Sequence, residues 1–230
     1  MVKLAIMQPY FLPYLGYWQL IKAVDKYVVY DNVTYIKGGW INRNNLLVSG
    51  EKKMFTISLK GASSFRLINE IEIGDGFDKL LKMVQTNYAK APYFNEVKKL
   101  LKDIVSFESR VLSGFITNSL RIILKYLNID TEILISSELS LHTELKGKDK
   151  VIKICEHLGA DTYYNAIGGQ ELYSKAEFVA HGIELRFLKT NLRPYTQQKC
   201  DFVPGLSILD LLMFNSPESV NQMLDDYELV

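Results

Sequence analysis

The sequence predicts an α/β protein with a Rossmann-like, mainly parallel sheet, because short apolar runs alternate with helical patterns at both ends of the chain. Residues 4–7 form an apolar run that is typical of a strand buried on both faces, and a helical pattern over 17–23 leads to a second run over 27–30. The region 77–126, between the two alternating ends, is largely helical. We therefore expect one domain over 1–230, with 77–126 as a helical insertion or subdomain.

The remaining elements follow from the same patterns. Segment 33–45 contains two glycines and is too irregular for a helix, so we expect it to line a crevice beside the second strand. Period-two alternation predicts a strand over 68–73. The other expected elements are a strand at 53–59, helices at 77–88 and 95–126 with a break at 91–92, a strand at 130–136, a helix at 148–158, strands at 162–165 and 182–189, and closing helices at 207–214 and 220–227.

Composition and charge exclude several function classes. Hydrophobic residues make up 48% of the chain, and 27 basic residues against 26 acidic ones leave a net charge of +1, so no global field favours DNA or an anionic membrane. No stretch is long enough to span a bilayer, and Gln8 and Pro9 interrupt the N-terminal apolar run, unlike a signal peptide. Cys155 and Cys200 are too few for a disulfide scaffold. We expect a cytoplasmic protein with free thiols and no membrane insertion.

The loops after the strands carry the polar residues that could form a site. In open parallel sheets ligands bind beyond the carboxyl ends of the strands, which here means 8–16 and 31–32. The candidate side chains in such loops are Gln8, Tyr10, Tyr14, Asp31, Trp40, Arg43, Asn44 and Asn165. The three histidines, His142, His157 and His181, are far apart in sequence, and the chain has no P-loop and no GxSxG motif, so we expect neither a metal site nor covalent catalysis. Such a site would orient and polarise its substrate.

The turn after the first strand has a nucleotide-binding parallel. The tetrad at 14–17 is similar in position to the H-x-G-H tetrad of nucleotidylyltransferases and pantothenate synthetases, in which the glycine lets the adenine approach and the histidines contact phosphate. Here Tyr14 and Tyr17 replace both histidines and carry no positive charge at neutral pH. Nucleotide binding is consistent with this corner, with Gly16 permitting close approach, but phosphate chemistry of that kind is not. From the tetrad alone, simple aromatic packing is the favoured interpretation.

Two further segments offer binding groups. Arg43 could pair with a carboxylate or phosphate, and Trp40 offers a flat face to a sugar or base, although an exposed hairpin with one packed tryptophan explains the segment equally well. Asn165 precedes Gly168 and Gly169, whose amides could hold an anion at a helix start, but a plain strand-to-helix turn is the commoner cause of such a pair. The basic run at 146–150 is more often a solvated face than a phosphate clamp.

An ordered set of motifs resembles the WbqC-like protein family. The set comprises Gln8-Pro9, Pro13, Gly16-Tyr17, Asp25, Asp31, Trp40 with Asn42-Arg43-Asn44, 91–94, 159–161 and 206–215, and so covers nearly the whole chain. The resemblance implies a bacterial protein from gene clusters for O-antigen and other surface polysaccharides, including lipopolysaccharide, and a proposed transfer of glycine or a similar acyl group to an amino sugar. The chain departs from the family at Tyr14, where many relatives have tryptophan.

Residues and resemblance together predict a transferase that forms an amide on the amine of a nucleotide-linked deoxyamino sugar. The predicted catalytic residues are Gln8, Tyr17, Asp31 and Asn44, and the predicted substrate-binding residues are Pro9, Tyr10, Tyr14, Gly16, Trp40, Arg43, Asn165, Gly168 and Gly169. Asp31 would orient the amine, Gln8, Tyr17 and Asn44 would donate to the oxyanion, and Arg43 would anchor an anionic group. The acyl donor would arrive activated, as an adenylate, a thioester or an aminoacyl-tRNA.

Two other functions remain open at this point. The first is a nucleotidylyl-transferring or adenylate-forming enzyme that uses ATP with a divalent metal. The second is a non-catalytic protein that binds a sugar nucleotide and organises other polysaccharide-biosynthesis enzymes. No resident metal is expected in the amide-forming reaction.

Overall fold

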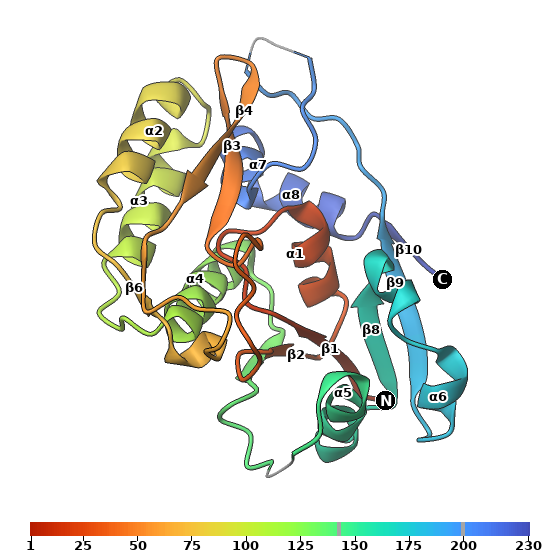
Figure 1. The fold of residues 1–230 in the computed structure, drawn as a ribbon. Coiled ribbons are helices and arrows are strands. Elements are labelled where there is room, and N and C mark those ends of the chain that lie inside the picture. Colours follow the sequence, from red (N-terminus) through yellow and green to blue (C-terminus); the bar gives the residue numbers. More distant parts are fainter. Residues whose placement is uncertain (142–143, 199–200) are drawn as a thin grey trace.

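In the computed structural model, which describes residues 1–141, 144–198 and 201–230, a six-stranded sheet forms the centre of the protein (Figure 1). Its order is β10-β9-β8-β1-β2-β7. The strands are β1 (Lys3–Met7), β2 (Lys26–Val29), β7 (Glu132–Ile135), β8 (Thr162–Ala166), β9 (Glu184–Thr190) and β10 (Tyr227–Leu229). Neighbouring strands run parallel except β9 and β10, which are antiparallel. The predicted α/β class with a mainly parallel sheet is therefore confirmed.

The chain leaves β1 on one side and returns to it on the other. Helix α1 (Leu15–Lys22) connects β1 to β2, and β7 pairs with the far edge of β2. Helix α5 (Gly147–His157) then carries the chain back to β8, which pairs with β1 on its other edge. The gap between the carboxyl ends of β1 and β8 is thus the topological switch point of the sheet, where such folds bind ligands.

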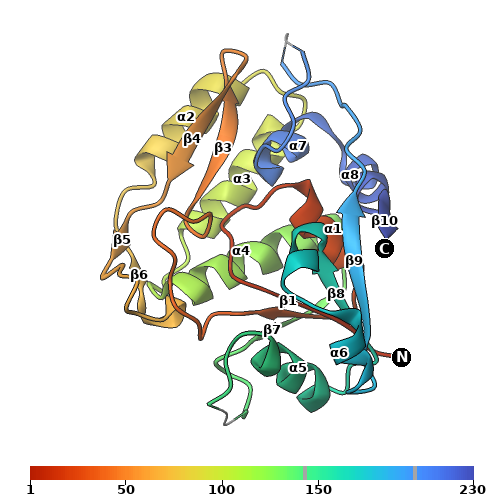
Figure 2. The same cartoon turned by 45° about the vertical axis from the view of Figure 1, so that its right-hand side comes forward.

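Helices cover both faces of the sheet. One hydrophobic core joins α1 and the helices of the middle region to side chains of β1 and β2 such as Ala5 and Tyr27. A second core packs α5 and α6 (Lys175–Val179) against the opposite face through side chains such as Ile6. Figures 1 and 2 show α5 and α6 on the face opposite α1. The apolar strands are buried on both sides, as the continuous apolar run of β1 predicts.

The middle region adds two hairpins and three long helices. The hairpins are β3 (Arg43–Val48) with β4 (Glu51–Thr56) and β5 (Leu59–Lys60) with β6 (Glu72–Ile73). The helices are α2 (Asp78–Tyr88), α3 (Phe94–Val105) and α4 (Leu112–Leu127), and α7 (Ile208–Phe214) and α8 (Pro217–Leu224) follow near the C-terminus. Short 3₁₀ helices occur at Ile68–Glu70 and, as η2, at Ile167–Glu171.

Four predicted segments are wrong in part. The predicted helix 95–126 is two helices, because α3 ends at Val105 and α4 begins only at Leu112. The segment 68–73 begins as a 3₁₀ helix, because the carboxylate of Glu70 accepts the Leu67 N–H at 2.9 Å and turns the chain before β6. The predicted helix 220–227 ends at Leu224, and its last residue instead begins β10, which forms through pairing with distant β9. The irregular segment 33–45 ends in β3, which starts at Arg43.

The structure describes one of the two cysteines, Cys155. Cys155 is buried and unpaired, and burial raises the pKa of its thiol to about 12, so it remains protonated at neutral pH. Cys200 and His142 lie outside the described residues.

Candidate functional site

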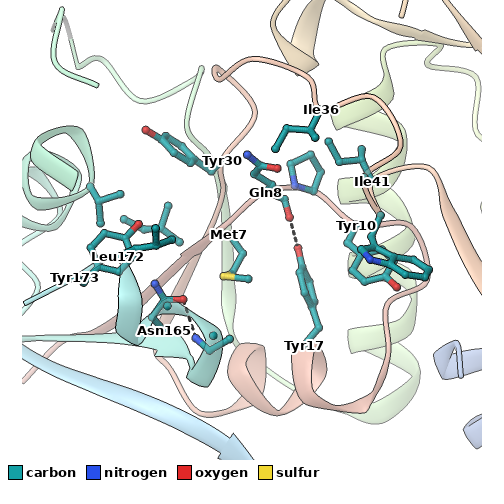
Figure 3. Close-up of a pocket in the computed structure, with 18 of the residues that line it drawn as sticks. Met7, Gln8, Tyr10, Tyr17, Tyr30, Ile36, Ile41, Asn165, Leu172 and Tyr173 are labelled. Carbon is teal, nitrogen blue, oxygen red and sulfur yellow. Dashed lines mark hydrogen bonds between the residues drawn. The ribbon is translucent and has the colours of Figure 1, made fainter. Parts of the chain in front are cut away.

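A cavity of about 520 Å³ lies at the switch point between β1 and β8 (Figure 3). Its lining comes from the carboxyl ends of β1, β2 and β8, the start of α1, the loop before β3, residue Val151 of α5 and the segment around η2. The lining residues are Ile6, Met7, Gln8, Pro9, Tyr10, Tyr14, Tyr17, Tyr30, Ile36, Gly39, Trp40, Ile41, Val151, Asn165, Ala166, Gly168, Gly169, Leu172 and Tyr173. The volume lies within the range of ordinary small-molecule sites.

Aromatic rings form two walls of the cavity. On one side, the ring of Tyr10 contacts those of Tyr14, Tyr17 and Trp40, with centroid separations of 6.3, 5.8 and 6.3 Å. Figure 3 shows Tyr30 and Tyr173 on the opposite side, with Gln8 and Met7 between the walls. Flat rings on both sides suit a ligand with a planar base or an apolar sugar face.

Gln8 presents the polar group at the centre of the site. Its backbone carbonyl accepts the Tyr17 hydroxyl at 2.8 Å, which fixes the strand end against α1. Its side-chain amide makes no hydrogen bond with any residue that the structure describes, and it projects into the cavity between the two walls (Figure 3). A carboxamide offers both donors and an acceptor, so Gln8 has its full capacity available for a ligand.

Asn165 is the second carboxamide of the lining, and it is held in place. Its side-chain oxygen accepts the Ala166 N–H at 2.7 Å, and its Nδ2 donates to the Tyr163 hydroxyl at 3.2 Å. The Asn165 side chain can lie here only because residue 169 is a glycine, since a Cβ at Gly169 would lie 2.8 Å from Nδ2 of Asn165. One amide proton of Asn165 has no acceptor among the residues that the structure describes, so it remains available to a ligand.

Within the described lining, no side chain is acidic, basic or a thiol. Two cations instead lie against the aromatic walls. The guanidinium carbon of Arg43 is 5.6 Å from the ring centroid of Trp40, and Nζ of Lys150 is 5.3 Å from that of Tyr30. Burial raises the pKa of Tyr10 and of Tyr17 and raises that of Tyr30 to about 12, so these phenols are neutral donors at pH 7.

The structure brings together most of the predicted site residues. The lining contains Gln8, Pro9, Tyr10, Tyr14, Tyr17, Trp40, Asn165, Gly168 and Gly169, whereas Gly16, Asp31, Arg43 and Asn44 do not line the cavity. The predicted roles of the residues in the lining stay predictions.

Asp31 and Asn44 instead make internal contacts. The Asp31 carboxylate is 1% exposed, and it accepts the Ser137 N–H at 2.9 Å, the Ser137 hydroxyl at 2.8 Å and the Ser136 hydroxyl at 3.0 Å. It therefore holds the ends of β2 and β7 together. Asn44 is also 1% exposed and donates to the Leu12 carbonyl at 2.6 Å, which fastens the turn after β1 to β3.

Gly16 and Arg43 support the site from outside its lining. A Cβ on Gly16 would lie 2.4 Å from Oγ1 of Thr190 and 2.8 Å from the Tyr14 ring, so the glycine lets α1 approach β9. Arg43 lies over the outer side of the site against the Trp40 ring, and its Nε is buried without a hydrogen-bond partner among the described residues.

Sequence reasoning missed part of the lining. Tyr30, Leu172 and Tyr173 form much of the second wall, with Ile36 and Ile41 on the other side and Val151 from α5. The position of Tyr30 at the end of the second apolar run was a usable signal, because the carboxyl end of a strand faces the site. Nothing local to Leu172 or Tyr173 indicates that η2 folds over the cavity.

Two properties of the described residues bear on function. No group of three histidine, cysteine, aspartate or glutamate side chains in this part of the chain is placed to hold a metal ion. Within the same ranges, no helix has both the length and the apolar character needed to cross a bilayer.

The fold and the cavity define an α/β protein with a neutral, aromatic cavity at the switch point of a mainly parallel sheet. The chain belongs to the WbqC-like protein family, whose model matches residues 8–222. It is similar to the "Uncharacterized protein Rv1507c" of Mycobacterium tuberculosis, with 28% identity over 218 residues that cover 92% of this chain and 93% of that protein. No solved structure matches the chain. The family membership predicted from the sequence motifs is thus confirmed.

Proposed function

We propose that this protein binds a nucleotide-linked deoxyamino sugar in the cavity and transfers glycine or another acyl group to its amine, as an enzyme of bacterial surface-polysaccharide (O-antigen) biosynthesis. The observation that carries the proposal is a cavity of about 520 Å³ with aromatic walls and two carboxamides at the switch point of the sheet. Its size and position suit a nucleotide or sugar ligand.

Recognition would rest on stacking and neutral hydrogen bonds. The rings of Tyr10 and Trp40 offer faces to a base or to the apolar side of a sugar. The side chain of Gln8 can pair with a ligand edge that carries an adjacent donor and acceptor. A site that hydrogen-bonds its ligand in this way discriminates strongly against an analogue that lacks the partner groups.

The reaction needs positioning more than a protein nucleophile. The lone pair of the neutral sugar amine attacks the carbonyl carbon of an activated acyl donor, the bond to the donor's leaving group breaks, and the amine proton passes to the leaving group or to water. The amide N–H groups of Gln8 and Asn165 can donate to the developing oxyanion, as can the neutral hydroxyls of the lining tyrosines other than Tyr17, whose proton goes to the Gln8 carbonyl. Holding the two reactants in contact supplies the rest of the acceleration.

A second candidate function is a sugar-nucleotide-binding protein without catalytic activity. The observation that favours it is that the described lining contains no carboxylate, imidazole or amine that could remove the proton from the substrate amine. Such a protein would present its ligand to other enzymes of the same biosynthetic process.

Incubation with candidate substrates separates the two functions. UDP- and dTDP-linked deoxyamino sugars would be mixed with acyl-CoA, glycyl-tRNA, or glycine with ATP and magnesium, and the products analysed by mass spectrometry. We expect a sugar nucleotide that has gained one acyl group on nitrogen. Binding without a product from any donor would favour the second candidate, and ATP–pyrophosphate exchange in the absence of a sugar would favour an adenylate-forming enzyme. Absence of binding would contradict both main candidates.

A further inference from the structure

A neutral cavity leaves the phosphates of a nucleotide-linked sugar without a counter-charge. We propose that Lys150 supplies it, by binding the diphosphate of the ligand at the edge of the cavity. This inference rests on the proposed function, because it assumes that the ligand is a nucleotide.

The position of Lys150 is set by the first turns of α5. The next residue, Val151, lines the cavity. The ammonium group of Lys150 lies 5.3 Å from the ring centroid of Tyr30, which lines the cavity from the end of β2. The lysine therefore lies directly behind one wall, beside the carboxyl ends of the strands.

The ammonium group of Lys150 uses only part of its hydrogen-bonding capacity within the described residues. It donates one hydrogen bond, to the backbone carbonyl of Asn32 at 3.0 Å, which leaves two of its three N–H groups for a ligand. Within the described residues no carboxylate oxygen lies within 4.0 Å of it. Partial burial lowers the pKa of Lys150, with the charge of Asp31 opposing the effect, as expected for a cation that lacks a close counter-ion. The Asp31 carboxylate is itself hydrogen-bonded to Ser136 and Ser137.

The neighbouring lysines are arranged differently. Lys148, two residues earlier, forms an ion pair with Glu177 and is exposed. Lys146 precedes α5 and is exposed, whereas Lys150 is half-buried. The basic run that sequence alone assigns to a solvated face thus contains one half-buried member, whose ammonium group lies against the Tyr30 ring of the cavity wall.

The helix itself adds to the attraction for an anion. Helix α5 has 11 residues and begins at Gly147, so Lys150 lies within its first turn. The N–H groups of a first turn have no acceptor within their own helix, and they carry the positive end of the helix dipole. Lysine and helix end therefore act in the same direction on a phosphate group.

The test compares charged and uncharged ligands by titration calorimetry. UDP, dTDP, GDP and ADP would each be titrated into the wild-type protein, and the corresponding nucleosides would serve as uncharged probes. The variants are Lys150→Met, which keeps much of the apolar stem, Lys150→Arg, which keeps the charge, and Lys148→Met as a matched control from the same turn.

One of the four diphosphates should bind the wild type most tightly. We expect the affinity of Lys150→Met for that diphosphate to be about 10- to 100-fold lower than the affinity of the wild type, because a charge-assisted hydrogen bond is lost. The affinity for the nucleoside should stay unchanged, Lys150→Arg should restore most of the loss, and Lys148→Met should bind like the wild type. A merely structural role for Lys150 would weaken the nucleoside and the diphosphate together.

The outcomes separate this inference from the proposed function. Equal diphosphate binding by the wild type and Lys150→Met would overturn the role of Lys150, whatever reaction the protein performs. Lys150-dependent diphosphate binding without acyl transfer would support the role of Lys150 and contradict the transferase. If none of the diphosphates binds the wild type, nucleotide recognition and the role of Lys150 are both wrong.

Discussion

Gly169 lies so close to Asn165 that any side chain there must displace the asparagine. A Cβ at Gly169 would lie 2.8 Å from Nδ2 and 2.9 Å from Cγ of Asn165, which is closer than side-chain carbons approach such atoms. The Gly169→Ala variant therefore tests directly whether the position of Asn165 matters for stability and for the site.

The size of the effect follows from the bonds that Asn165 would lose. Its side chain is 6% exposed and makes hydrogen bonds of 2.7 Å with the Ala166 N–H and 3.2 Å with the Tyr163 hydroxyl. Each such bond contributes about 0.5–1.5 kcal/mol net, so displacement should lower the free energy of unfolding by about 1–3 kcal/mol. Ligand binding should weaken as well, because Asn165 lines the cavity.

The neighbouring glycine provides the control. A Cβ on Gly168 would meet no atom within 4 Å, and Gly168 also lines the cavity. Both alanine variants restrict the unfolded chain to a similar degree, so the difference between them isolates the contact with Asn165. Urea-induced unfolding of the two variants measures that difference. Equal stability of Gly168→Ala and Gly169→Ala would refute the reasoning.

Two further predictions concern residues outside the lining. The Gly16→Ala variant should lose about 1–3 kcal/mol of stability in urea unfolding, because its Cβ would lie 2.4 Å from Oγ1 of Thr190. Adding Thr190→Ala should recover part of that loss. No recovery in the double variant would contradict the assigned contact. Burial raises the pKa of Asp210 despite hydrogen bonds from Tyr88, Tyr195 and Gln197, so the native state holds this proton more tightly than the unfolded chain. Its contribution is therefore complete below the unfolded pKa of about 3.9 and is lost as the pH rises through the higher native pKa. The stability of the wild type relative to Asp210→Asn should accordingly fall with rising pH across the acid range, and a difference that grows with pH would mean that the three donors keep the carboxylate ionised.

Local sequence patterns predicted the parts of the fold that depend on local physics. The apolar run of β1, the proline-rich corner and the polar residues after β1 and β8 placed Gln8 and Asn165 correctly at one edge of the sheet. Parallel strands buried on both faces are recognised in a sequence by their continuous apolar runs. Ligands of such sheets bind beyond the carboxyl ends of the strands, so the residues that follow these runs are candidate site residues. The part of the cavity formed by 8–16 could therefore be predicted without coordinates, whereas 31–32, the other predicted segment, does not line it.

Contacts between distant segments could not be predicted in the same way. Nothing near Asp31 indicates that Ser136 and Ser137 occupy its carboxylate, and nothing near Gly16 indicates the approach of Thr190. Lys150 differs from Lys148 only through the tertiary positions of Tyr30 and Glu177. The sequence alone thus does not tell which polar residues at strand ends face the cavity and which are held by partners from distant segments.

The central claim is that the cavity around Gln8 binds a nucleotide-linked amino sugar. Calorimetric titration of UDP- and dTDP-linked deoxyamino sugars into the wild type, Gln8→Leu and Gln170→Leu tests it, because Gln170 is exposed on η2 and does not line the cavity. The account predicts binding by the wild type and by Gln170→Leu, and at least about tenfold weaker binding by Gln8→Leu, since the ligand's polar edge would be left unpaired. Equal affinity of all three proteins, or no binding by the wild type, would contradict it.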